Sequence, residues 1–249
     1  MISDEWRETH VAGGYALARP WTRPAWSTSP RLPASLFTAS SSLAPIGPGP
    51  DVLSWVTATP DERARHLADL GLPGGELDAV AAWVEARHAS GEWGWPSFFT
   101  SIDAARAFVE TFQPRAPDLV ILGLALPRAY LDRYVADHPA DPGVGTFAID
   151  EAIRRPSTPA PGGTPLGYEV LGEELGGSFH SWHWNDLEPL VHDRLGITAN
   201  DEGLIDDLEA ATAAAELIGL DEVGAEPLRW RPWLLVRHPL ESAKQQSER

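Results

Sequence analysis

The sequence predicts an α+β protein, with a small mixed or antiparallel sheet flanked by five or six helices. Segments with helical periodicity and segments with strand periodicity are interspersed, but they do not alternate in the strict order of a βαβ protein. Hydrophobic residues make up 43% and charged residues 22% of the 249 residues, which is typical of a globular protein with a sizeable core. We therefore expect one compact domain over residues 51–240.

Residues 1–50 are expected to form a proline-rich arm that packs on the outside of this domain. Seven prolines lie between residues 11 and 50, and proline at this density works against regular helices and central strands. Trp21 and Trp26 are expected to hold the arm on the surface. A disordered arm is the alternative. At the other end, residues 241–249 are expected to form a polar tail.

Helix signals begin at Thr59. The sequence Thr59-Pro60-Asp61-Glu62 supplies a capping residue, a proline suited to the first helical position and a glutamate at the third. This helix is expected to end at Gly71. Apolar residues at helical spacing predict further helices; these cover residues 75–88, 101–113, 127–137, 187–195 and 205–218.

Residues 119–126 form an unbroken apolar run bounded by prolines, which is typical of a buried strand. Further strands are predicted over residues 145–149, 166–171, 179–184 and 233–236. The segments 166–171 and 179–184 are expected to pair as an antiparallel hairpin, because glycines between them can form the turn.

The composition argues against several classes of partner. A net charge of −17 disfavours nucleic acid and anionic membranes, because both attract cationic surfaces. No apolar run is long enough to span a bilayer, and acids stand where a signal peptide would carry basic residues, so we expect a cytoplasmic protein. The chain has no cysteine, which excludes disulfides, thiolate ligands and a cysteine nucleophile.

Residues 167–188 contain the side chains best suited to chemistry. The candidate catalytic residues are His180, His183 and Glu169, because a histidine beside a positioned carboxylate can act as an acid or base near neutral pH. The predicted hairpin would place Glu169 across from the histidines. A metal would need a third ligand, with His192, Glu169, Glu173 or Asp186 available, but the spacing matches no metal signature. We predict no metal and no cofactor.

The same segment offers a binding surface. Trp182 and Trp184 are two residues apart and would share one face of a strand, either as a stacking platform or as part of the core. Asn185 and Asp186 follow with hydrogen-bonding groups. We therefore expect a pocket or partner surface that includes His180 or His183 with Glu169 or Trp182. Two further segments are candidates for exposed aromatic edges: Trp93-Gly94-Trp95-Pro96 and Trp230-Arg231-Pro232-Trp233.

Three elements resemble those of uncharacterised bacterial proteins: Gly-Tyr-Glu-Val-Leu-Gly (167–172), Ser-Phe-His-Ser-Trp (178–182) and Gly-Leu-Ile-Asp-Asp (203–207). This resemblance implies no particular activity and no site residues. In type, but not in motif, the chain is also similar to small cytosolic immunity proteins, which are acidic, poor in cysteine and rich in aromatic residues.

Two functions remain open. The first is a non-catalytic cytosolic protein of the immunity type that binds another protein, which fits the charge, the 11 tryptophans and the lack of a complete catalytic set. The alternative is an enzyme or binder of a small molecule that uses residues 180–186 for acid–base or metal chemistry. Absence of a familiar motif is weak evidence against catalysis, so the first hypothesis is only narrowly preferred.

Overall fold

The computed structural model describes residues 5–23, 25, 27, 29, 32–40, 59–72, 76–90, 98–137, 148–174, 179–184 and 186–240. These residues form an antiparallel five-stranded sheet, a small two-stranded sheet and several helices, so the predicted α+β class is confirmed. The helices in these ranges are α1 (Trp6–Thr9), α3 (Pro60–Asp69), α4 (Leu77–Ala89), α5 (Ile102–Phe112), α6 (Arg128–Asp137), α7 (Ala148–Arg154), α8 (Glu188–Leu195) and α9 (Leu208–Ile218). None of them is both long and apolar enough to cross a membrane.

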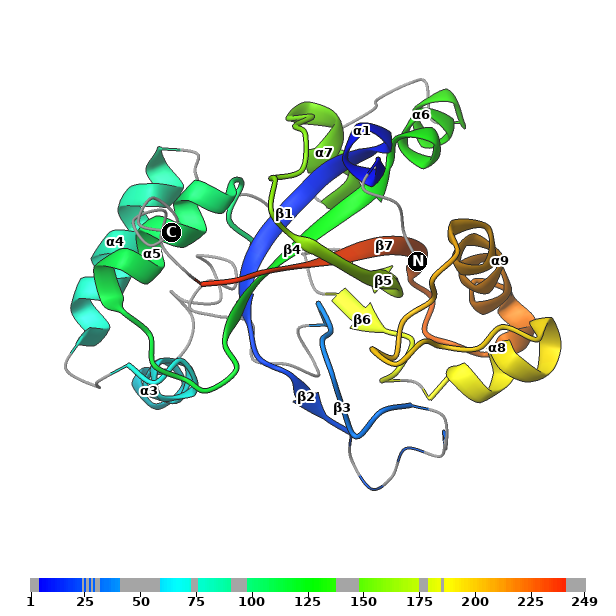
Figure 1. Ribbon diagram of the computed structural model, residues 1–249, viewed down its shortest axis with the longest axis horizontal. Helices are drawn as coiled ribbons and strands as arrows, with labels where there is room; N and C mark the ends of the chain where they lie inside the picture. Colours follow the sequence, from blue (N-terminus) through cyan, green and yellow to red (C-terminus); the bar gives the residue numbers. More distant parts are fainter. Residues whose placement is uncertain are drawn as a thin grey trace.

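The main sheet has the strand order β1-β4-β7-β5-β6, and every neighbouring pair is antiparallel (Figure 1). Its strands are β1 (His10–Ala18), β4 (Val120–Pro127), β5 (Thr164–Glu173), β6 (Phe179–Ser181) and β7 (Arg229–His238). The long strand β7 lies at the centre and pairs with β4 on one side and β5 on the other. The two-stranded sheet consists of β2 (Trp21–Thr22) and β3 (Ser35–Leu36).

One face of the main sheet, which we call the first face, is covered by two groups of helices. Around Tyr15 and Ile121 it packs against α3, α4 and α5, whereas around Tyr168 and Leu234 it packs against α8 and α9. Figure 1 shows these two groups at opposite ends of the molecule. Alternate residues of each strand point to the same face, so the two apolar clusters share one side of the sheet.

The opposite side, the second face, is formed by residues such as Leu124, Trp233 and Leu235. It is covered by α7, by Phe98 and by Phe37 and its neighbours. By the register of the strands, Glu169 and Glu173 on β5 and Arg231 on β7 also project from this face. All three side chains are buried. The second face therefore combines an apolar core with buried charge, and buried charge is expensive unless it is paired or hydrogen-bonded.

Most predicted helices follow their local signals. Helix α5 begins after Ser101, whose Oγ accepts a hydrogen bond from Ala104 N at 3.2 Å. Helix α9 begins after Asp207, whose Oδ1 accepts from Ala210 N at 2.8 Å. Helix α8 ends at Gly196 with φ 69°, a left-handed conformation that glycine adopts without strain.

Several predicted segments differ from the structure. Strand β1 lies inside residues 1–50, where we predicted an arm outside the domain, because the prolines begin only at Pro20 and leave residues 10–18 free to pair with β4. Ala148 and Ile149 lie in α7 rather than in a strand. Strand β6 ends at Ser181 instead of residue 184. Helix α9 starts at Leu208, since Ile205 instead pairs with Tyr168 through backbone hydrogen bonds.

Candidate functional site

Glu169, a candidate catalytic residue, lies on the second face and is fully buried. Thr38 Oγ1 and Ser181 Oγ donate to its Oε1 at 2.5 and 2.6 Å, and Ala39 N donates to Oε2 at 2.9 Å. Burial raises the pKa of Glu169 to about 7, although the hydrogen bonds from Ser181, Thr38 and Ala39 oppose the shift. Both carboxylate oxygens are thus engaged by residues 38–39 and Ser181, so the expected pairing with a histidine is not formed.

His183, the second catalytic candidate, is buried at 1% exposure in the turn that follows β6. Its Nε2 accepts a hydrogen bond from Trp182 Nε1 at 3.0 Å. Burial lowers the pKa of His183 to about 3, against small opposing effects from the Gly203 backbone and Asp186. The ring is therefore neutral near pH 7 and is shut off from solvent, which fits a structural role better than proton transfer.

The predicted tryptophan platform is not formed, because β6 ends at Ser181 and residues 182–184 form a turn. Trp182 is buried at 1% exposure, whereas Trp184 is 42% exposed. Asp186 accepts a hydrogen bond from Ser27 Oγ at 3.0 Å, which connects the turn to the N-terminal segment. Asn185 lies outside the described residues. The Trp230 to Trp233 segment is also buried rather than an exposed edge, because it belongs to the central strand β7.

Of the predicted catalytic residues, His180 lines a pocket that the described residues form. The pocket has a volume of about 440 Å³ and is lined by Glu173, Glu174, His180, Glu226, Pro227, Leu228 and Arg229. We call it the His180 pocket. By the strand register, His180 stands opposite Gly172 and so projects from the first face, whereas Glu173 projects from the second. The pocket therefore lies at the end of the sheet, where residues from both faces meet.

Two glutamates hold the His180 ring. Its Nδ1 lies 2.8 Å from Glu226 Oε2, and its Nε2 lies 3.4 Å from Glu174 Oε2. The His180 side chain is 18% exposed, while those of Glu226 and Glu174 are 38% and 54% exposed. This arrangement places one partly exposed carboxylate beside each nitrogen of the imidazole.

Glu173 supplies a third carboxylate from the inside of the protein. Its Oε2 lies 2.9 Å from Arg231 NH1, and both side chains are almost completely buried. Burial raises the pKa of Glu173, and the Arg231 guanidinium and the nearby Trp233 indole counteract this shift. Both carboxylate oxygens are buried, and Trp233 is a further hydrogen-bond partner of Glu173 inside the protein.

The charges around the His180 pocket are unequal. Three glutamates and one arginine line it, so its lining is acidic when His180 is neutral. These groups do not form a metal centre: no three histidine, aspartate or glutamate side chains among the described residues are arranged to hold an ion. His192, another predicted ligand, lies on α8, where its Nδ1 is 3.2 Å from Ile197 O. The arrangement is suited to holding a cationic group by hydrogen bonds and charge.

Comparisons of this chain with protein-family models, curated proteins and solved structures find no match.

Sequence reasoning identified His180 and weighed Glu173, but it missed Glu226 and Arg231 as parts of the site. Glu226 lies 46 positions after His180, so only the folded chain brings the two together. Arg231 did give a signal, because a charged residue stood inside an otherwise apolar strand sequence, Trp-Arg-Pro-Trp-Leu-Leu-Val. A buried arginine needs a partner, and that requirement predicts a carboxylate on the neighbouring strand.

Proposed function

We propose that the protein is a non-catalytic binding protein that recognises a basic partner protein, and that the His180 pocket receives an arginine or lysine side chain of that partner. The observation that carries the proposal is the convergence of Glu173, Glu174 and Glu226 on one 440 Å³ pocket. Carboxylates bind guanidinium groups by charge-assisted hydrogen bonds, and an arginine can contact two oxygens at once.

The overall charge supports the same proposal. A protein with a net charge of −17 attracts cationic partners over long distances and accelerates their encounter. General acidity alone gives little specificity, because exposed charges are screened by salt. A pocket adds specificity, since Glu174 and Glu226 lie close together beside His180 and can contact the same cationic group.

The catalytic alternative receives less support from the described residues. His183 is neutral and buried, and Glu169 is hydrogen-bonded to two hydroxyls and an amide. Acid–base catalysis needs a titrating group within reach of a substrate. Neither residue meets this requirement, so the predicted set of His180, His183 and Glu169 does not come together as a catalytic unit.

The proposal is tested with a short peptide that presents one arginine, acetyl-Gly-Ser-Gly-Arg-Gly-Ser-Gly-amide. The matched probe carries citrulline, which has nearly the shape of arginine without its charge. Titration followed by nuclear magnetic resonance should show shifts around His180 and Glu226 with the arginine peptide, and shifts at least tenfold weaker at the same concentration with citrulline. Equal responses to both peptides would contradict the proposal.

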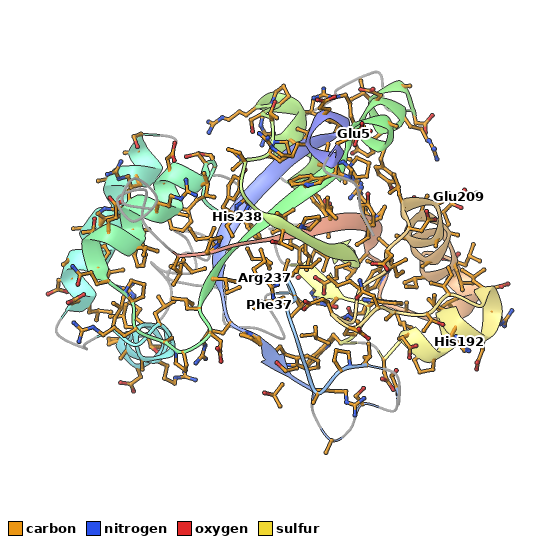
Figure 2. The ribbon with its side chains drawn as sticks, in the orientation of Figure 1. Glu5, Phe37, His192, Glu209, Arg237 and His238 are labelled. Atoms are coloured by element: carbon orange, nitrogen blue, oxygen red, sulfur yellow. The ribbon has the colours of Figure 1, made fainter. Side chains whose placement is uncertain are left out.

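Variants distinguish binding at the His180 pocket from attraction by the overall negative charge of the protein. The change Glu174→Gln with Glu226→Gln should abolish the response, because it removes the two accessible carboxylates. The control, Glu110→Gln with Glu209→Gln, changes the net charge by the same amount at exposed positions on α5 and α9; Figure 2 shows Glu209 on α9. If the control loses binding as much as the pocket variant, only non-specific attraction is present and the proposal fails.

A further inference from the structure

A second pocket lies on the other side of the Glu173–Arg231 ion pair. It has a volume of about 520 Å³ and lies between α6, α9 and the start of β7. Arg229 lines both pockets, so they are neighbours, but their chemistry differs. This second pocket, which we call the Arg231 pocket, carries Arg133, Arg229 and Arg231 together with the aromatic side chains of Tyr130, Tyr134 and Trp230.

Arg231 is the buried cation at the base of this pocket. Its side chain is only 4% exposed, and its Cζ lies 5.1 Å from the centre of the Tyr134 ring. A guanidinium has five N–H donors, of which NH1 faces Glu173 at 2.9 Å. Its Nε is buried and makes no hydrogen bond to the described residues. Tyr130 is a second hydrogen-bond partner of the guanidinium, beside Glu173.

Neighbouring residues hold the guanidinium and the rings in position. Arg229 NH1 donates to Tyr134 Oη at 3.1 Å, and Trp230 Nε1 donates to the backbone oxygen of Glu226 at 3.2 Å. Burial raises the pKa of Tyr130, and the nearby Arg231 partly counteracts that shift. Tyr130 therefore stays protonated near neutral pH and remains a possible hydrogen-bond donor.

We infer that the Arg231 pocket binds a small organic monocarboxylate with a flat apolar body. The carboxylate would accept hydrogen bonds from Arg231, and the body would lie against Tyr134 and Trp230. A volume of 520 Å³ is in the usual range for a small-molecule pocket. Arginine binds carboxylates in a planar, often two-pronged geometry, which gives this group its specificity.

The acidic residues of the pocket narrow the class of ligand. Asp137 and Glu216 line it as well, and both are exposed. With Glu173 behind Arg231, three carboxylates balance the three arginines, so the pocket has no large surplus of positive charge. A polyphosphate needs a surplus of positive charge that this balance does not supply, whereas a single carboxylate needs only one well-placed guanidinium.

The ligand class is tested with three probes of one shape. Indole-3-acetate carries the carboxylate, indole-3-acetamide is its neutral amide, and tryptamine is a cation with a similar ring. Calorimetric titration of the full chain should give indole-3-acetate an affinity at least tenfold above that of either of the others. Equal affinities for acid and amide, stronger binding of tryptamine, or no binding of the acid at millimolar concentration would each overturn the inference.

Variants locate the binding in the structure. Arg231→Lys keeps a positive charge beside Glu173 but lacks Nε and the planar group, so it should lower the affinity for the acid about tenfold and leave that for the amide unchanged. Arg237→Lys makes the same change at the other end of β7, where Arg237 is partly exposed, and should have no effect (Figure 2).

If Arg231→Lys does not fold, Thr212→Trp replaces it. Thr212 lines the pocket from α9, so a large ring at this position should fill the space without disturbing the ion pair and should abolish binding. Unchanged binding in the folded variant would show that the ligand lies elsewhere and would overturn the inference.

Discussion

At the scale of single residues, Glu169 connects burial to a measurable effect of pH. Its pKa is about 7 in the folded protein and near the ordinary value of 4.5 in the unfolded chain. Below pH 4.5 both states are protonated and the group costs no stability. As the pH rises from 4.5 to 7 the unfolded chain loses its proton first, so the folded state becomes less favourable.

We predict that the free energy of unfolding falls more steeply between pH 4.5 and 7.5 in the wild type than in Glu169→Gln. The difference should reach up to about 3 kcal/mol, the free energy that corresponds to the change in pKa. Urea unfolding at a series of pH values measures it. The wild type and Glu169→Gln share all other titrating groups, so the difference between their pH profiles reports Glu169 alone. Parallel pH profiles for the two proteins would show that Glu169 titrates as it would in water.

The same scale shows why the site was only partly predictable. His180 was identified because histidine is chemically distinctive, and Glu173 because it is near in sequence. Which of the two histidines reaches the pocket depends on where β6 ends, because the turn at residues 182–184 places the His183 side chain in the core. Strand ends depend on tertiary contacts, and no local signal separates these two histidines.

At the scale of secondary structure, apolar residues at helical spacing located the helices, but the start of α9 was predicted three residues too early. Ser101 begins α5 and Asp207 begins α9, each with a hydrogen bond to a free backbone amide. Strand β7 was predicted over four residues but runs from Arg229 to His238. Its first half contains Arg231 and Pro232, which disfavour a strand prediction; here Arg231 is accommodated by its ion pair with Glu173.

The cap of α5 gives a prediction at this scale. Ser101→Ala should lower the free energy of unfolding by about 1 kcal/mol, because it leaves the Ala104 amide without its acceptor. Thermal or urea unfolding measures the loss. Ser101→Asp is the matched control and should restore most of the stability, since aspartate also caps helices and its charge suits the helix N-terminus. Equal losses in both variants would argue against the cap.

At the scale of the whole molecule, the sequence predicted the class and most elements but not the way in which the N-terminus joins the sheet. The prolines counted over residues 11–50 led to the prediction of an arm, although the nine-residue strand β1 contains none of them. The strand is recognisable only through its partner β4, more than 100 residues further along the chain, and through close approaches that a side chain would prevent. At Gly13, for example, a Cβ atom would lie 2.3 Å from the Trp233 ring.

This arrangement makes the N-terminal segment part of the fold. Strand β1 buries Tyr15 and Leu17 against the first-face core and pairs along β4 from Val120 to Pro127. A chain that starts at residue 19 would expose both the apolar surface and the unpaired edge of β4. Exposed edges of this kind favour aggregation. We therefore predict that the shortened chain is insoluble or lacks a cooperative thermal transition by circular dichroism.

The control is a deletion at the other end of the chain. A protein that lacks the polar residues 241–249 should unfold as the wild type does. The single change Leu17→Ala refines the test, because it removes buried apolar volume from β1 without cutting the strand and should cost about 2–5 kcal/mol. If the chain from residue 19 is monomeric and unfolds cooperatively at the wild-type temperature, the N-terminal segment is an arm after all, and residues beyond it are sufficient to form the domain.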